Sequence, residues 1–508
     1  MPPDVTAPDL TLGIAGSGAM GCGIAQIAAQ AGVRVLLYDG LPDVAVQARG
    51  RLADSFDLLA RKGSITPAQA ADALSRLQPV AQLSDLSACG ILIEAIVENL
   101  DAKRRLFSAI ENVVAADTIL ATNTSSLSVT ALAAACRLPG RVAGFHFFNP
   151  VPRRKVVEVI DGLLTESWAI EALMGLARRV GHAPVRCRDT PGFIVNHAGR
   201  GLVTEALRVL QEGIAPFHDI DRILREAAGF PLGPFELLDL TGLDVSQPVM
   251  ESIYHQFYEE PRFRPSPLTA QRLAADVLGR KSGTGFYRYT ENRREEIPEP
   301  PPPRPRPVRV WVGSADPGLR AQVITLVKQL GGSIDANRRP ATDSLCVVTP
   351  RGLDATSCCA TESLDATRTV ALDLLLGSNR RRTLMTTPLT SPAMREAAHG
   401  LFAADGVPVT VIRDSPGFIV QRVLAQIVNI GCDIAQQRIA APQDIDRAVM
   451  LGLGYPQGPL AWGDALGPRI VLNVLESLQQ FYGDPRYRPS PWLKRRALLG
   501  VSLLTPES

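Results

Sequence analysis

The sequence contains one set of motifs twice, in the same order and at a nearly constant spacing. Residues 189–196, Asp-Thr-Pro-Gly-Phe-Ile-Val-Asn, recur at 414–421 as Asp-Ser-Pro-Gly-Phe-Ile-Val-Gln. Two further pairs keep this spacing to within one position: 230–235 with 455–460, and 260–267 with 484–491. Three ordered matches indicate an internal duplication, so a fold for this chain must contain a repeated domain.

A proline-rich segment separates the two halves. Residues 298–307 read Pro-Glu-Pro-Pro-Pro-Pro-Arg-Pro-Arg-Pro. Proline supplies no N–H to a helix or a strand ladder, so this composition favours an extended polyproline spacer. A chain of 508 residues is also too long for a single hydrophobic core. We therefore predict a linker over 297–307.

The N-terminal segment carries a glycine-rich turn between a strand and a helix. The apolar strand 10–15 enters this turn, a helical run follows, and the next strand, 33–38, ends on Asp39. GxGxxG alone is a weak signal, but an acid at the end of the next strand makes it typical of a dinucleotide-binding unit. Asp39 favours ribose hydroxyls over a 2′-phosphate, which predicts NAD. The turn residues expected at the pyrophosphate are Gly16, Ser17, Gly18, Ala19, Met20 and Gly21.

The alternation of strands and helices defines the remaining domains. It continues to about Cys187 and predicts a doubly wound parallel sheet, whereas the periodicity from Asp189 to Tyr258 is helical. The predicted fold class is therefore α/β plus all-α. The predicted domains are a NAD-binding Rossmann domain (1–187), a helical domain (188–296), the linker (297–307), a degenerate Rossmann-like domain (308–412) and a second helical domain (413–508).

The first turn of the second α/β segment has lost the phosphate-binding pattern. Residues 313–318 read Gly-Ser-Ala-Asp-Pro-Gly. The carboxylate of Asp316 would repel a pyrophosphate, and Pro317 removes an N–H that would bind it. We expect no dinucleotide to bind there.

A histidine occupies the end of a buried strand in the first α/β segment. The strand 141–145 leads into His146, and the Asn149-Pro150 step ends it. Glu158 interrupts the next apolar run, and a hydroxyl-rich turn at 123–126 precedes the strand. A histidine, a carboxylate for its second ring nitrogen and a hydroxyl are the parts of a proton-transfer site. The alternative is a core histidine that a nearby acid satisfies.

The composition indicates in which cellular compartment the protein is expected and which kinds of binding partner are not. The formal net charge is +2 and charged residues make up 20% of the chain, which points to neither nucleic acid nor a membrane surface. We find no secretory signal and no apolar run of bilayer length. The eight cysteines show no CxxC pair and no zinc-like spacing with histidine. We expect a cytoplasmic protein with reduced thiols and no metal site.

Together these motifs resemble the 3-hydroxyacyl-CoA dehydrogenase family. The chain carries, in family order, GxGxxG, Glu-Ala-Ile-Val-Glu-Asn-Leu, Asn-Thr-Ser-Ser-Leu, His-Phe-Phe-Asn-Pro-Val-Pro, Asp-Thr-Pro-Gly-Phe-Ile-Val-Asn and Gly-Pro-Phe-Glu-Leu-Leu-Asp. With its degenerate second half it is similar to the long 3-hydroxyadipyl-CoA and 3-hydroxybutyryl-CoA dehydrogenases of aromatic-acid degradation. The resemblance implies NAD-dependent oxidation of an L-3-hydroxyacyl-CoA, in β-oxidation or phenylacetate-type catabolism.

The resemblance also implies roles for individual residues. His146 matches the general base, Glu158 the carboxylate that orients it, and Ser125 and Asn196 the groups that position the substrate oxygen. The positions that match cofactor contacts are Asp39, Glu98, Lys103, Ser125, Asn149 and Lys281. Ser55 and Lys62 match contacts to CoA, although a polar residue on a helix face is as often merely solvated.

Basic residues near the expected site depart from the family pattern and bear on the substrate. Arg153 and Arg154 replace apolar residues, and Arg200 follows Asn196 by about one helical turn. Arg200 would bind a distal carboxylate, as in 3-hydroxyadipyl-CoA; alternatively it pairs with Glu205 or faces solvent. The other functions left open are a 3-hydroxybutyryl-CoA dehydrogenase, a dehydrogenase of free hydroxy acids and a catalytically silent NAD-binding relative.

The duplication predicts an internal partner. Two-domain relatives typically dimerise through their helical domains, so we expect the two helical domains of this chain to pack against each other. Formation of a homo-oligomer is left open.

Overall fold

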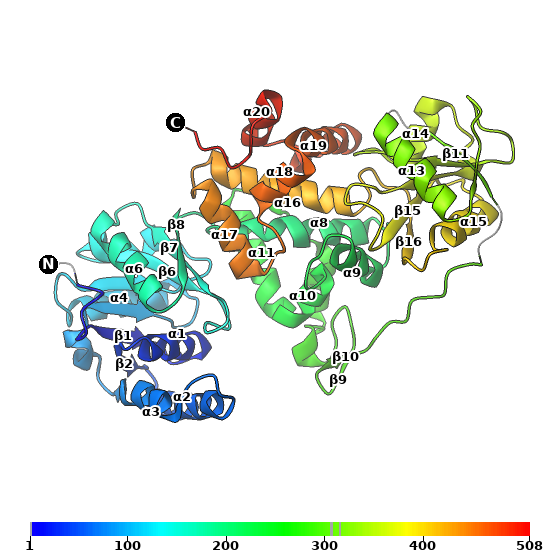
Figure 1. The fold of residues 1–508 in the computed structure, drawn as a ribbon. Coiled ribbons are helices and arrows are strands. Elements are labelled where there is room, and N and C mark those ends of the chain that lie inside the picture. Colours follow the sequence, from blue (N-terminus) through cyan, green and yellow to red (C-terminus); the bar gives the residue numbers. More distant parts are fainter. Residues whose placement is uncertain (1–2, 305–307, 314–315, 508) are drawn as a thin grey trace. The chain divides into compact units, whose positions relative to one another are not determined.

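The structure is a computed structural model that describes residues 3–304, 308–313 and 316–507 (Figure 1). The chain forms two compact units. The first consists of residues 1–197, 434–454 and 506–508, and the second of 198–433 and 455–505. A piece of the second helical domain therefore belongs to the same unit as the N-terminal sheet. None of the described helices is both long and apolar enough to cross a membrane.

The first unit contains an eight-stranded sheet in the order β3-β2-β1-β4-β5-β6-β7-β8. Its strands are β1 (Thr11–Ala15), β2 (Arg34–Tyr38), β3 (Leu77–Val80), β4 (Ile91–Glu94), β5 (Ile119–Thr122), β6 (Val142–Phe147), β7 (Val156–Asp161) and β8 (Ala183–Arg188). Its helices are α1 (Ala19–Gln30), α2 (Val44–Arg61), α3 (Pro67–Ser75), α4 (Leu100–Glu111), α5 (Val129–Ala133), α6 (Ser167–Arg179), α7 (Val195–Ala198) and α17 (Pro442–Leu453).

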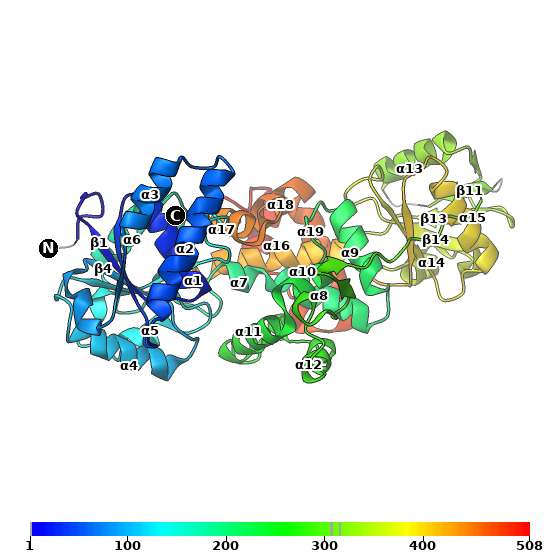
Figure 2. The ribbon, with the colours of Figure 1, turned by 90° about the horizontal axis from the view of Figure 1, so that it is seen from below.

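Helices cover both faces of this sheet. One core joins α1, α2, α3 and α6 to the strands, and a second core joins α4 and α5 to the opposite face. Figure 2 shows α2 and α3 on one side of the strands and α4 and α5 on the other. The central strands β4, β5, β6 and β7 are largely buried on both faces, as expected for crossover connections, whereas the edge strands β3 and β8 expose some residues.

The sheet is mixed, which corrects the prediction of a wholly parallel one. β6 and β7 pair antiparallel, with His146 opposite Glu158. Only residues 148–155 connect these strands, and a parallel connection needs a crossover of a dozen or more residues. The short connection thus forces the reversal that places the two side chains side by side.

The second unit contains helices of both copies and a second sheet. Its helices outside that sheet are α8 (Arg200–Gln211), α9 (Phe217–Glu226), α10 (Pro234–Thr241), α11 (Leu243–Gln256), α12 (Pro267–Ala274), most of α16 (Val420–Gln436), α18 (Pro459–Leu466), α19 (Pro468–Tyr482) and α20 (Pro491–Leu499). A short hairpin, β9 (Tyr289–Thr290) and β10 (Arg293–Arg294), follows the first copy.

The duplication extends to the hydrogen bonds. α10 and α18 begin at the same spacing as the repeated sequence motifs (459 minus 234 equals 414 minus 189). Asp239, in α10, accepts hydrogen bonds from the backbone N–H groups of Phe286 and Tyr287. The equivalent Asp464 accepts from Leu503 N–H and Ser502 Oγ. The same residue holds the closing segment of each copy.

The second sheet has six strands in the order β12-β11-β13-β14-β15-β16. Its elements are β11 (Arg309–Val312), α13 (Pro317–Gln329), β12 (Ser333–Ile334), β13 (Leu345–Val348), α14 (Ala355–Glu362), β14 (Thr369–Leu372), β15 (Arg382–Thr386), α15 (Pro392–Phe402) and β16 (Val409–Ile412). The predicted degenerate Rossmann-like domain is present, and β14 and β15 again pair antiparallel.

This sheet lacks counterparts of β3 and β4 among the described residues. Asp189 accepts hydrogen bonds at the start of α5, and Asp414 does so at the start of α14. α14 therefore corresponds to α5, and β13, which precedes it, corresponds to β5. β13 pairs directly with β11, so the strand-helix unit that carries Glu98 and Lys103 in the first sheet has no equivalent.

The predicted linker is described only in part. Residues 297–304 form neither helix nor strand. Residues 305–307 of the linker, and Ser314 and Ala315 of the degenerate turn, lie outside the described residues.

Candidate active site

The centre of the site is a histidine–carboxylate pair at the end of the sheet. His146 Nδ1 lies 2.6 Å from Glu158 Oε2, and the two residues are 4% and 0% exposed. The other oxygen of Glu158, Oε1, accepts hydrogen bonds of 2.9 Å from the backbone N–H groups of Ile194 and Val195. The carboxylate is thus held by protein on both oxygens.

This arrangement determines which ring nitrogen performs chemistry. Because Nδ1 of His146 is engaged by Glu158, Nε2 remains for proton transfer. A buried carboxylate also stabilises the imidazolium that forms when Nε2 accepts a proton. The same contact would be present if His146 were only a core histidine that hydrogen-bonds to a nearby acid. The groups around the pair therefore have to distinguish this interpretation from a proton-transfer site.

The two predicted substrate-positioning residues contact each other beside this pair. Asn196, in α7, donates from Nδ2 to the backbone oxygen of Ser125 at 3.3 Å. α7 begins with Val195, whose N–H binds Glu158. The same short helix therefore connects Asn196 to Ser125 on one side and to the Glu158–His146 pair on the other. All four residues of the predicted quartet lie in the first unit.

Glu98 organises the loop that carries Ser125. Its Oε1 accepts hydrogen bonds from Thr124 Oγ1 (2.7 Å), Ser125 N (2.8 Å) and Ser126 N (3.0 Å). Lys103, 1% exposed, lies 3.3 Å from Oε2. Burial alone would raise the pKa of Glu98, but Lys103 and these hydrogen bonds hold it below its usual value. Lys103 also pairs with Glu94, so it links the end of β4 to the Ser125 loop.

The glycine-rich turn fits a dinucleotide. A Cβ on Gly16 (φ 105°) would lie 2.5 Å from the backbone oxygen of Ala95, whereas at Gly18 nothing lies within 4 Å of the added atom. Close packing behind the turn and open space before it are what a pyrophosphate requires. Asp39 accepts from Ser17 N at 2.8 Å and Leu41 N at 3.1 Å, which fixes it at the end of β2. Asn149 is exposed just after β6.

Sequence reasoning missed two residues. Asn123 Oδ1 accepts the N–H of Phe147 at 2.8 Å and so ties the Ser125 loop to the strand of His146. Arg51, exposed on α2, donates from Nη2 to the backbone oxygen of Ser17 at 3.1 Å. An asparagine beside the serine turn was a usable signal for the first. No local pattern marks Arg51, because its contact joins two separate elements of the chain.

Other predicted contact residues lie apart from this centre. Ser55 sits on α2, where its hydroxyl donates to the backbone oxygen of Arg51 at 2.9 Å, and Lys62 is the exposed residue that ends α2. Lys281 lies in the second unit and pairs with Asp244. The structure thus connects Ser55 to the Ser17 turn through Arg51.

Arg200 belongs to the second unit, whereas Asn196 belongs to the first. α7 ends at Ala198 and α8 begins at Arg200, so one continuous helix does not carry both side chains. Burial lowers the pKa of the Arg200 guanidinium to about 10, and Tyr455 acts in the opposite direction. Glu205, the alternative partner in the sequence, instead binds Arg422 and Tyr487.

The second sheet presents other residues at the positions of the pair formed by His146 and Glu158. Gly144 lies opposite Thr122 in the first sheet, and Ala371 lies opposite Val348 in the second. Two positions further along each strand come His146 and Asp373. Asp373 donates its backbone N–H to Thr383 O at 3.0 Å, so an aspartate and a threonine stand where His146 and Glu158 stand.

Gln421 fills the place of Asn196 in the repeat. Its Nε2 donates to Pro350 O at 3.1 Å and to Asp373 Oδ1 at 3.0 Å, while its Oε1 accepts from Gly352 N at 2.8 Å. Burial raises the pKa of Asp373, against the hydrogen bond from Gln421. The repeat keeps the contact between helix and loop but has no imidazole in it.

Family models match both halves of the fold. The NAD binding domain of 3-hydroxyacyl-CoA dehydrogenase matches residues 11–190, and the C-terminal domain of the same enzyme matches residues 192–289 and again 417–502. The chain belongs to the 3-hydroxyacyl-CoA dehydrogenase family. Two matches to one C-terminal domain also agree with the internal duplication.

Some relatives match nearly the whole chain, and others match only its first half. The 3-hydroxyadipyl-CoA dehydrogenase of Escherichia coli K12 is 37% identical over 489 residues, 96% of this chain and 98% of that protein. A probable 3-hydroxybutyryl-CoA dehydrogenase of Deinococcus radiodurans is 39% identical over 55% of this chain and 100% of its own length. The crystal structure of 3-hydroxybutyryl-CoA dehydrogenase from Escherichia coli K12 superposes with a TM-score of 0.84 at 36% identity, over 97% of this chain and 98% of that one.

Proposed function

We propose that His146 is the general base with which this family member oxidises the 3-hydroxyl of an L-3-hydroxyacyl-CoA. Family membership makes the chain an NAD-dependent dehydrogenase of 3-hydroxyacyl-CoA substrates. The observation that carries the residue roles is the 2.6 Å contact between His146 and a Glu158 carboxylate that is itself fixed by Ile194 and Val195. The test is NADH formation from a panel of 3-hydroxyacyl-CoAs and the matching free hydroxy acids.

The mechanism uses the four residues in order. Ser125 and Asn196 hold the substrate hydroxyl by hydrogen bonds, and His146 Nε2 removes its proton as the C3 hydrogen departs with its electron pair. Bound NAD supplies the acceptor for that hydride. Glu158 stabilises the resulting imidazolium, so the proton rests on His146 while the C3–O bond becomes a carbonyl. The burial of His146 and Glu158 keeps water from competing for this proton.

Arg51 should contribute to cofactor binding. Its guanidinium already reaches the turn expected to hold the cofactor pyrophosphate, so it adds one positive charge at that anion. Arg51→Gln should weaken NADH binding by about fivefold to tenfold, as expected for one charge-assisted hydrogen bond at an exposed site. Equilibrium binding by NADH fluorescence at low and high salt measures this. Arg49→Gln is the control, because Arg49 lies on the same helix but donates to Leu77 O. Equal NADH affinity of the two variants would contradict this role.

For the substrate, we propose an acyl chain with a distal carboxylate. An anionic partner stabilises a poorly solvated guanidinium such as that of Arg200, and the lowered pKa of Arg200 records the cost of its burial. Arg153 and Arg154 follow the strand of His146 and are additional candidates. The similar protein named as a 3-hydroxyadipyl-CoA dehydrogenase supports the same substrate class.

The substrate proposal predicts a charge preference. The kcat/KM for 3-hydroxyadipyl-CoA should exceed that for 3-hydroxyhexanoyl-CoA, which has the same chain length without the charge. Arg200→Leu should remove most of that preference, equivalent to about 1–3 kcal/mol for the diacid alone. Equal kcat/KM for both substrates in the unmodified enzyme would count against a distal carboxylate site.

We further propose that the second half serves as a built-in partner for the first. In the first unit, the N–H of Arg188 donates to Ile439 O, which belongs to the repeat. In the second unit, the N–H of Arg413 donates to Ile214 O. Arg413 is the repeat equivalent of Arg188, and Ile214 is the first-copy equivalent of Ile439. Such a reciprocal exchange is the signature of a two-fold, self-complementary interface, and it supports an arrangement in which each sheet is completed by the other helical copy.

A buried ionic cluster supports the same proposal. Arg422, in α16 of the repeat, is 0% exposed and donates to Glu205 of α8 at 2.9 Å and to Glu212 at 2.8 Å. Tyr487 of the repeat also donates to Glu205, at 2.8 Å. A buried guanidinium needs such partners, and those of Arg422 come from both copies.

A further inference from the structure

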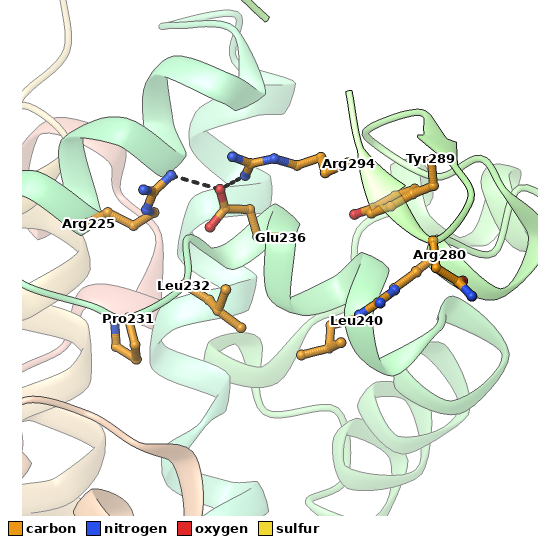
Figure 3. A pocket seen from close by; sticks show the side chains of 9 residues that line it. Arg225, Pro231, Leu232, Glu236, Leu240, Arg280, Tyr289 and Arg294 are labelled. Atoms are coloured by element: carbon orange, nitrogen blue, oxygen red, sulfur yellow. Dashed lines mark hydrogen bonds and ion pairs between the residues drawn. The ribbon is translucent and has the colours of Figure 1, made fainter. Parts of the chain in front are cut away.

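The first helical copy contains a hollow of about 280 Å³ beneath the β9–β10 hairpin (Figure 3). Arg225 comes from α9, Glu236 from α10, and Arg294 from the hairpin. Arg280 approaches from the 3-10 turn Arg280–Ser282. We call this site the arginine hollow, defined by Arg225, Glu236, Arg280 and Arg294. Its lining residues belong to the second unit, whereas the four residues of the proposed chemistry belong to the first.

The charges of the arginine hollow do not balance. Arg225 Nη1 donates to Glu236 Oε1 at 2.9 Å, and Arg294 binds the same oxygen. Oε2 of Glu236 is taken by the N–H of Gly233 at 2.9 Å. Glu236 is the single acid among the lining residues, which include three arginines, so the lining carries a formal charge of +2. Burial and the nearby charge of Arg225 lower the pKa of Arg294, as crowded cations require.

The other side of the hollow is apolar. Leu232 is 36% exposed and Leu240 is 51% exposed. Figure 3 shows them below Arg225, Glu236 and Arg294, with the Arg280 side chain extending toward Leu240. The Tyr289 hydroxyl donates to Asp239 at 3.1 Å, so its ring is held in place. A cationic wall that faces exposed aliphatic side chains suits a ligand with an anionic end and an apolar end.

The helical fold does not require this cluster. When the two copies are aligned on their repeated motifs, Met450 takes the place of Arg225 and Ala461 takes the place of Glu236. The repeat nevertheless keeps the structural aspartate of the same helix, since Asp464 matches Asp239 in position and in role. The pair of Arg225 and Glu236 is therefore an addition to a scaffold that the repeat forms without it.

From this placement we infer that the arginine hollow binds the phosphate group of a small phosphate ester whose apolar part lies on Leu232 and Leu240. A phosphate monoester carries nearly two negative charges and three acceptor oxygens, which match a +2 lining of guanidinium groups. A carboxylate would leave one charge unmatched. The volume is sufficient for a phosphate with one small ring or a short chain.

The test uses phenyl phosphate as the probe, by titration calorimetry of the full chain with its NAD site saturated. Phenyl phosphate should bind, and benzoate and phenol should bind at least tenfold more weakly. Arg280→Gln should weaken phenyl phosphate about tenfold. Arg293 is an exposed residue next to Arg294 but outside the lining, so Arg293→Gln should change the affinity for phenyl phosphate less than twofold. Methyl phosphate measures the contribution of the apolar wall and should bind more weakly than phenyl phosphate.

Several outcomes would overturn this inference. The first is that the Arg280→Gln and Arg293→Gln variants bind phenyl phosphate with equal affinity, and the second is that the unmodified protein binds phenol as tightly as phenyl phosphate. The third is that saturation with NAD abolishes phenyl phosphate binding, and the fourth is that the unmodified protein does not bind phenyl phosphate at all. Because Arg280 is exposed, the variant should keep the melting temperature of the parent. Leu240→Asp provides a second test. It places a negative charge on the apolar wall, so this variant should bind phenyl phosphate more weakly than the unmodified protein does.

Discussion

Replacing His146 by alanine should lower kcat by roughly 10²- to 10⁴-fold, the usual contribution of a general base. In the proposed mechanism the imidazole is the proton acceptor in the pair with Glu158, and the second sheet has no imidazole at the equivalent strand position. The affinity for NADH should stay within about twofold, because the glycine-rich turn and Asp39 do not contact His146. Steady-state rates and NADH fluorescence separate the two effects.

The repeat offers a matched control for this change. Asp373 occupies in the second sheet the position that His146 occupies in the first, and Gln421 holds it at 3.0 Å. Asp373→Asn should therefore leave kcat within about twofold. His146→Gln keeps a polar partner for the buried Glu158 and guards against a loss of folding. Substantial turnover by both His146 variants, or a large loss in Asp373→Asn, would mean that the second half performs chemistry.

Removal of the second half, which leaves residues 1–296, should destabilise the first half and change its state of association. Truncation removes α17, which packs on β7 and β8, and Arg422, the partner of the buried Glu205. Loss of one member of a buried ion pair costs about 3–5 kcal/mol, and the apolar face of α8 becomes exposed to water. We expect a dimer that restores the contact between two copies, or an aggregate. Light scattering after size exclusion, with a melting curve, measures both.

Cleavage of the linker provides the control for truncation. A protease site placed between residues 297 and 304, a segment without helix or strand, should leave both halves bound to each other after cleavage. The contacts Arg188–Ile439 and Arg413–Ile214 do not depend on the linker. A shortened chain that is monomeric, soluble and as stable as the full protein would refute the role of the repeat as an internal partner.

Much of the site could be predicted because its signals are local. The strand, the glycine turn and Asp39 follow one another closely in the chain. The glycines determine the backbone conformation of the turn, and Asp39 supplies the contact expected at the end of the next strand. His146 was predicted at the end of a buried strand, Glu158 within the next apolar run and Ser125 in a hydroxyl-rich turn. Arg51 could not be predicted, because its use depends on α2 returning to the Ser17 turn. The sequence likewise did not predict that Glu98 accepts hydrogen bonds from three groups of the 124–126 loop.

By itself the sequence determined the existence of the duplication, the loss of the GxGxxG spacing in the second half and the class of fold, and it singled out His146 as the candidate for proton transfer. Each of these follows from residues that lie close together in the sequence and affect one another locally. Only the tertiary structure decided that Ile194 and Val195 hold Glu158, and that Arg188 and Arg413 exchange partners between the copies. These features join segments that lie far apart in the chain, so strand register and helix packing select them, and no local pattern encodes them.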